Sequence, residues 1–111
     1  MFLKERLLIF MRQRGLIMLR KINEGYVISN EGYKVKLGRH HLSYIEDNGH
    51  AITFKTESMV NPYLREIYFS VKDPFWHIPY ELEKLTPDKL ETIKNRIIKV
   101  LIFLGINYKF F

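Results

Sequence analysis

The stretch from residue 86 to residue 105, TPDKLETIKNRIIKVLIFLG, decides the fold. Thr86 is a favourable N-cap, Pro87 suits the first helical position, and Asp88 complements the positive end of the helix dipole. Gly105 is typical of the left-handed residue that ends a helix. Apolar residues recur every three or four positions between these signals: Leu90, Ile93, Ile97, Val100, Leu101 and Leu104. The stretch therefore predicts a helix that packs one face against a core.

The sequence before this helix predicts short strands joined by hairpin turns. Residues 33–37 (YKVKL) alternate apolar and cationic side chains, which is typical of a strand with one face in the core and the other in water. Gly25, Gly32 and Gly49 close Asn-Glu-Gly and Asp-Asn-Gly sequences that favour tight turns, because glycine adopts positive φ at low cost. The predicted strands are 16–22, 26–29, 33–37, 42–45, 51–55 and 66–71, with a loop at 56–65.

The order of these elements predicts the fold class. Ile106, Tyr108 and Phe110 alternate after the helix and predict a short final strand. Runs of strands followed by one helix are typical of α+β proteins. We therefore expect a twisted antiparallel sheet of hairpin-linked strands packed on one long C-terminal helix. The helix covers one face of the sheet, so the other face is a candidate for function.

Size and composition fit a single intracellular domain. The chain has 111 residues, 47% of them hydrophobic, which is enough for one core. It has no cysteine, so it cannot form disulfides, zinc ribbons, thiol nucleophiles or iron–sulfur sites. A reducing, cytoplasmic location is expected on this basis.

The positive charge is concentrated at the N-terminus. The formal net charge is +6, with 18 basic and 12 acidic residues. Residues 1–21 hold six of the basic residues and one acid, so 12 basic and 11 acidic residues remain for the rest. The body of the protein is therefore nearly neutral, unlike a typical nucleic-acid-binding domain.

The basic leader, residues 1–17, stands apart from the predicted single domain at 18–111. Its apolar run at 7–11 is shorter than the roughly 20 residues of a membrane span or the roughly 7–15 of a signal-peptide core. No membrane span is predicted. The leader is read as a short packed helix, as an extension before a native start at Met18 in place of Met1, or as a tail that touches a membrane or nucleic acid.

No motif for catalysis is present, and the protein is not expected to be an enzyme. His40, His41, His50 and His77 lack the spacing of a metal site, and no nucleophile elbow or phosphate-binding glycine loop occurs. No metal or cofactor is predicted. Arg39, His40, His41 and Tyr44 contain the groups of a metal-independent ribonuclease, but so does almost any sequence of this composition.

The aromatic segment 75–80 (FWHIPY) is the most informative candidate for binding. We expect Trp76 to fill the gap between sheet and helix, with Pro74 and Pro79 fixing the direction of the chain. Aromatic residues that stay outside such a segment are typical anchors of protein interfaces. The expected partner-binding residues are His77, Tyr80, Tyr63 and Arg65, followed by Arg39, His40 and His41.

The pattern over residues 18–111 resembles a known family. Its elements are Ile22 followed by Gly25-Tyr26-Val27, a charged hairpin, the segment Pro74-Phe75-Trp76-His77-Ile78-Pro79, a proline-started helix with Ile93 and Ile97, and the exit Leu104-Gly105-Ile106. Together they resemble small immunity proteins of bacterial polymorphic-toxin and contact-dependent growth inhibition systems. The resemblance implies a cytoplasmic protein without catalytic residues. Such a protein binds the C-terminal toxin domain of a delivered effector and blocks its active site.

Charge distinguishes this chain from many members of that class. Immunity proteins against nuclease toxins are often acidic, so a neutral to basic chain implies an acidic or largely apolar toxin surface.

Two alternative functions stay open. The first alternative is a small nucleic-acid-binding or ribonuclease protein of a toxin–antitoxin type, which would use the leader with Lys34 and Lys36. The second is a structural interaction domain, including a homodimer formed by pairing exposed sheet edges.

Overall fold

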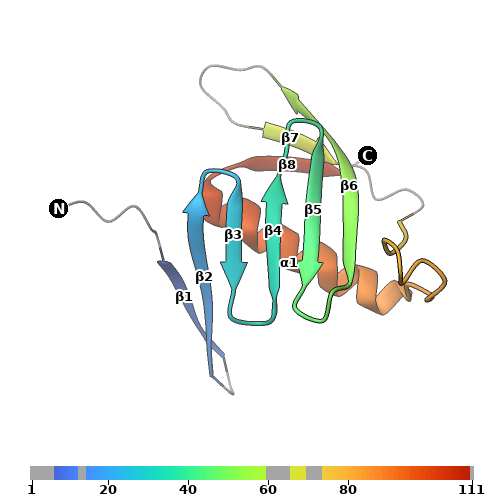
Figure 1. The fold of residues 1–111 in the computed structure, drawn as a ribbon. Coiled ribbons are helices and arrows are strands. Elements are labelled where there is room, and N and C mark those ends of the chain that lie inside the picture. The colour runs from blue at the N-terminus through green and yellow to red at the C-terminus, as the bar shows by residue number, and fades with distance from the viewer. Residues whose placement is uncertain (1–6, 13–14, 60–65, 70–73, 111) are drawn as a thin grey trace.

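The computed structural model describes residues 7–12, 15–59, 66–69 and 74–110, and the side chains of residues 18–57 and 74–109. These residues form eight strands and one helix: β1 (Leu7–Arg12), β2 (Gly15–Asn23), β3 (Tyr26–Ser29), β4 (Tyr33–Leu37), β5 (His41–Glu46), β6 (Ala51–Met59), β7 (Glu66–Phe69), α1 (Pro87–Leu104) and β8 (Asn107–Phe110). Strands adjacent in sequence are neighbours in the sheet (Figure 1). The predicted α+β fold with one C-terminal helix is confirmed.

The direction of pairing changes only at the last strand among those described. Strands β1 to β7 pair antiparallel with their neighbours, as hairpin connections require. Strand β8 instead pairs parallel with β7. The chain between them contains α1, which carries it back across the sheet, and parallel neighbours need such a crossover.

Helix α1 begins and ends where its sequence signals predict. The Thr86 hydroxyl accepts a hydrogen bond from the backbone N–H of Lys89 at 3.1 Å, and Pro87 is the first helical residue. Gly105 ends the helix with φ 72°, and its N–H donates to the carbonyl of Ile102. Ends of this kind satisfy backbone groups that would otherwise lack partners.

The core lies between α1 and one face of the sheet, as Figure 1 shows. The helix stripe contributes the buried residues Ile93, Ile97, Val100, Leu101, Phe103 and Leu104. The sheet contributes every second residue of its strands, namely Leu19, Val27, Tyr33, Val35, Leu42, Tyr44, Ile52 and Phe54. This period of two leaves the alternate side chains of the same strands on the face turned away from α1.

The structure differs from the predicted elements in two places. The helix interpretation of residues 1–17 is wrong for Leu7–Arg12, which forms strand β1 and pairs with β2 from Leu7↔Arg20 to Arg12↔Gly15. A helix this short is marginal alone, whereas an edge strand gains a ladder of hydrogen bonds. Strand β6 also continues to Met59, through the first part of the predicted loop at 56–65, because β7 pairs with its far end.

Strand β7 is described to Phe69, so the predicted extension of that strand to residue 71 lies outside the described residues. Within the described part of the chain, no helix has the length and apolar character needed to cross a membrane.

Candidate functional site

Residues 74–86 form an ordered loop at one corner of the sheet, here called the corner loop. Trp76 anchors it: the indole is buried and belongs to the hydrophobic core. The backbone N–H of His77 donates to the carbonyl of Ala51 at the start of β6, at 2.8 Å. Leu85 also packs partly buried against the core. The loop is therefore held at both ends although it has no regular secondary structure.

His50, from the turn between β5 and β6, lies at the centre of this corner. Its ring stacks on Tyr80 with centroids 3.6 Å apart and meets the ring of Trp76 edge-on at 5.0 Å. Its two ring nitrogens face oxygens of Asn48 at 3.0 Å and of Glu83 at 2.7 Å. The Tyr80 hydroxyl donates to the backbone carbonyl of Asn48. These contacts fix the middle of the corner loop on the β5–β6 hairpin.

The corner loop nevertheless exposes three large apolar side chains. Phe75 is 67% exposed, Ile78 is 82% exposed and Leu82 is 95% exposed. The burial of Trp76, the hydrogen bond from His77 and the stack of Tyr80 on His50 hold the loop in this arrangement. Rigid, exposed apolar groups are suited to contact with a partner, because little conformational entropy is lost when they are covered.

The residues expected at this site fall into distinct groups. His77 is exposed, whereas Tyr80 is half-buried and stacked on His50, so it supports the loop more than it faces solvent. Pro74 and Pro79 flank the anchored part of the loop, and the Ile78–Pro79 peptide bond is cis. Tyr63 and Arg65, predicted to be neighbours of His77 and Tyr80, lie outside the described residues.

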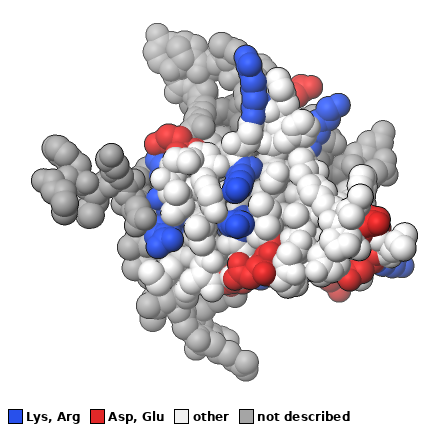
Figure 2. Space-filling model, in the orientation of Figure 1, with Lys and Arg blue, Asp and Glu red and all other residues white. Residues whose placement is uncertain are grey.

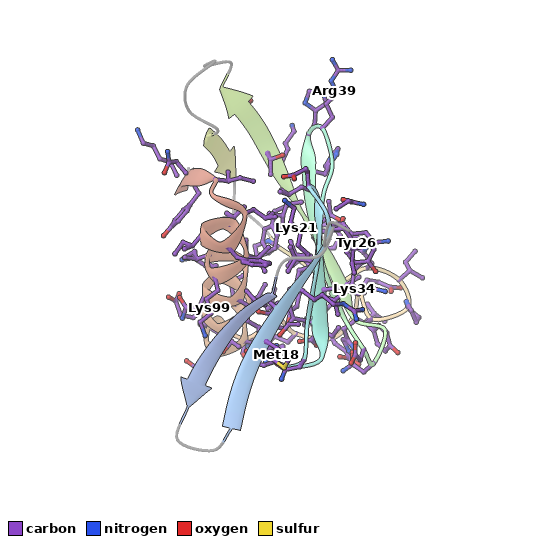
Figure 3. The ribbon with its side chains drawn as sticks, turned by 90° about the vertical axis from the view of Figure 1, so that its left-hand side faces the viewer. Met18, Lys21, Tyr26, Lys34, Arg39 and Lys99 are labelled. Atoms are coloured by element: carbon purple, nitrogen blue, oxygen red, sulfur yellow. The ribbon has the colours of Figure 1, made fainter. Side chains whose placement is uncertain are left out.

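Arg39, His40 and His41 lie at the other end of β5 from the corner loop, and all three are exposed. Figure 3 shows Arg39 at the tip of the hairpin between β4 and β5. A six-residue strand separates the two groups by about 17 Å. Among the described residues, His77 and Tyr80 therefore do not form one continuous site with Arg39, His40 and His41.

Tyr44 is fully buried on the side of the sheet that faces α1, so it is not available to the exposed Arg39, His40 and His41. The four groups considered for a ribonuclease do not come together. No group of three or more His, Asp or Glu side chains placed to hold a metal ion occurs among the described residues.

A partly buried network between sheet and helix includes Glu46, whose role the sequence analysis did not identify. The Glu46 carboxylate accepts hydrogen bonds from the Tyr44 hydroxyl at 2.7 Å and from the Lys89 ammonium at 2.6 Å. Arg96 donates to the Tyr44 hydroxyl at 2.6 Å and lies 3.5 Å from Glu46. Lys89 and Arg96 come from α1, so the network ties the helix to β5.

The network shifts the pKa values of its members. Burial alone would raise the pKa of Glu46, but hydrogen bonds from Lys89 and Tyr44 and the charges of Lys89 and Arg96 outweigh it and lower that pKa. Burial and the hydrogen bond to Glu46 raise the pKa of the Tyr44 hydroxyl. Glu46 therefore stays ionised beside Lys89 and Arg96, which contact it from α1. These contacts join the helix to the sheet, so we interpret the network as structural.

The sequence contains signals for Glu46 and Leu82, two residues whose positions the sequence analysis did not predict. Glu46 continues the inward alternation of Leu42 and Tyr44, which places its carboxylate against the helix. Leu82 lies between two glutamates in a segment without hydrophobic periodicity, which favours exposure.

A comparison of the chain with protein-family models, with curated proteins and with solved structures finds no match.

Proposed function

We propose that this protein is an immunity-type binding protein that neutralises a bacterial toxin domain by covering its active site. The proposal combines the resemblance over residues 18–111 with the geometry of the corner loop. Blocking of this kind is stoichiometric and needs no catalytic group in the immunity protein. The proposed location is the cytoplasm of the producing cell, where the toxin would act.

The exposed apolar triplet Phe75, Ile78 and Leu82 carries the proposal. Interface energy concentrates in a few apolar or aromatic anchors surrounded by polar contacts. The anchors here sit on a loop fixed by Trp76 and by the stack of His50 on Tyr80. Exposed His77 supplies a polar contact beside them. A loop held in this way would lose little conformational freedom on binding, which favours tight and slowly dissociating complexes.

Substitutions in the corner loop test the proposal. The binding assay uses the candidate toxin domain, which is the C-terminal domain encoded by the gene immediately upstream, with affinity measured by calorimetry. A triple variant, Phe75→Ser with Ile78→Ser and Leu82→Ser, removes the apolar anchors without touching Trp76 or Tyr80. Ile102→Ser on α1 is the control, because Ile102 is 62% exposed and lies near the C-terminal end of the helix, whereas the corner loop precedes its N-terminal end.

The triple variant should lose at least about tenfold in affinity, since one exposed anchor that becomes buried in an interface is worth about 1 kcal/mol or more. Its melting temperature should stay close to that of the wild type, because the replaced side chains are exposed. Unchanged affinity in the triple variant, or an equal loss in Ile102→Ser, would contradict the corner loop as the contact site.

A further inference from the structure

Among the described residues, no segment covers the face of the sheet turned away from α1. The open face is the surface of β2 to β6 turned away from α1, and its side chains alternate with those of the core. Tyr26 and Lys34 point to this side in Figure 3, whereas Lys99 lies on the opposite side with α1. The sequence analysis identified this face as a candidate for function but assigned no binding partner to it.

Cations occupy the middle of the open face. Lys34 and Lys36 are alternate residues of β4, so their Cα atoms lie about 7 Å apart on the same side. The Lys36 ammonium lies over the Tyr26 ring, 4.9 Å from its centroid. Neither lysine forms an ion pair with any described residue. Figure 2 shows basic side chains in the centre of this face and acidic ones toward its margins.

Apolar and hydroxyl groups surround these cations. Ile28 and Ile45 are the cross-strand neighbours of Lys34 on either side, and both are half-buried. The hydroxyls of Ser43 and Thr53 lie 3.3 Å apart and satisfy one another. The open face therefore combines positive charge with partly exposed isoleucine side chains, and charge of one sign on such a surface selects a partner of the opposite sign.

This composition favours an acidic protein over a nucleic acid. Sheets that bind single strands present aromatic rings on which successive bases stack. Among the described residues of the open face, the aromatic rings are those of Tyr26 and His41; Lys36 already lies over the Tyr26 ring, and His41 stands at the end of β5. The isoleucines beside Lys34 would gain nothing from phosphate but would be buried by a protein surface.

We infer that the open face docks a carboxylate-rich protein surface, with Lys34 and Lys36 meeting its acidic groups. If the partner is the toxin domain, an assignment that rests on the proposed function, the toxin surface that meets the sheet is acidic. Complementary charge of this kind speeds association and selects the partner. In this proposal the partner contacts two regions of the protein, the corner loop and the open face.

Two defined probes test this inference without a toxin. One is a fluorescent peptide of alternating glutamate and leucine, and the other is oligothymidylate of equal charge. Binding is followed by fluorescence anisotropy and by amide chemical shifts at low and high salt. The variant is Lys34→Glu with Lys36→Glu. Lys94→Glu with Lys99→Glu on α1 is the control, because it changes the net charge equally on the opposite side. Thermal unfolding verifies that both variants fold.

The peptide should bind with amide shifts centred on β3 to β5, and the β4 variant should weaken it at least about tenfold while the α1 variant changes it about twofold or less. Tighter binding of oligothymidylate than of the peptide would overturn the inference in favour of a nucleic-acid surface. Equal losses in both variants, or no binding of the peptide, would also overturn it. The proposed function is tested separately, by measuring toxin binding of the triple serine variant of the corner loop. Failure of that test would leave the result with the two probes unaffected.

Discussion

Removing the charge of Glu46 should weaken the connection between the sheet and α1. The Glu46→Gln side chain keeps the shape and one acceptor for the Tyr44 hydroxyl. It loses the attraction to Lys89 at 2.6 Å and to Arg96 at 3.5 Å. A hydrogen bond to a charged group contributes about 1.5–3 kcal/mol, and water reaches part of both cations, so we expect a loss of about 2 kcal/mol at neutral pH. For a chain of this length, that lowers the melting temperature by about 9 °C.

The loss should depend on pH in a definite direction. The folded protein holds the pKa of Glu46 below its ordinary value of 4.5. The ionised carboxylate therefore stabilises the fold above that ordinary value, and this contribution is lost as the pH falls through the lowered pKa. Wild type and Glu46→Gln should differ fully near pH 7 and converge at strongly acidic pH.

Urea denaturation followed by tryptophan fluorescence measures this effect, because Trp76 is the single tryptophan and lies in the core. Asp47→Asn is the matched control: Asp47 adjoins Glu46 but is exposed, and it forms no ion pair with a described residue. The control should change the free energy of unfolding by less than about 0.5 kcal/mol. A similar small change in Glu46→Gln, or a difference that persists undiminished at low pH, would refute the reasoning.

Substitutions at three further positions test the fold by thermal or urea unfolding. Trp76→Ala should cost about 3–5 kcal/mol, because it empties a buried site and frees the corner loop, and a cost below 1 kcal/mol would show that Trp76 is no anchor. Thr86→Ala should cost about 1 kcal/mol through loss of the N-cap, whereas Thr86→Ser should be nearly neutral. Gly105→Ala should cost about 1 kcal/mol from its φ of 72° alone, since no atom lies within 4 Å of the added methyl group, and a stabilised variant would contradict this.

Local signals explain why so much of the fold was predictable. The N-cap at Thr86 and the left-handed Gly105 set the helix ends through contacts within a few residues. The strict alternation at Tyr33–Leu37 fixed both the strand and its faces. Signals of this kind act within a turn or a hairpin, so they are readable without knowledge of the rest of the chain.

The misread parts depend on partners distant in sequence. Strand β1 forms because β2 offers a free edge, and β7 extends β6 by pairing beyond the predicted end. Glu46 is stabilised by cations from α1, 43 and 50 residues further along the chain. His50 becomes central only because the corner loop folds back onto the β5–β6 turn. No pattern within a short window contains these contacts.

The ordered loop and the burial of Trp76 were predictable, but the exposed residues of the loop were not. The two prolines and the aromatic residues of 74–80 indicated an ordered loop with Trp76 inside, and the structure places Trp76 in the core. Which apolar residues stay exposed depends on how the loop crosses the sheet corner. Ile78 and Leu82 face solvent, while Tyr80 is half-buried against His50.

Co-expression tests the central claim most directly. The chain is produced together with the candidate toxin domain, which is the C-terminal domain encoded by the gene immediately upstream, and host growth and co-purification are scored. The account predicts that the toxin domain alone arrests growth, that the chain restores growth, and that the two proteins purify as a complex of equal stoichiometry. Growth arrest that the chain does not relieve, with no complex recovered, would contradict it.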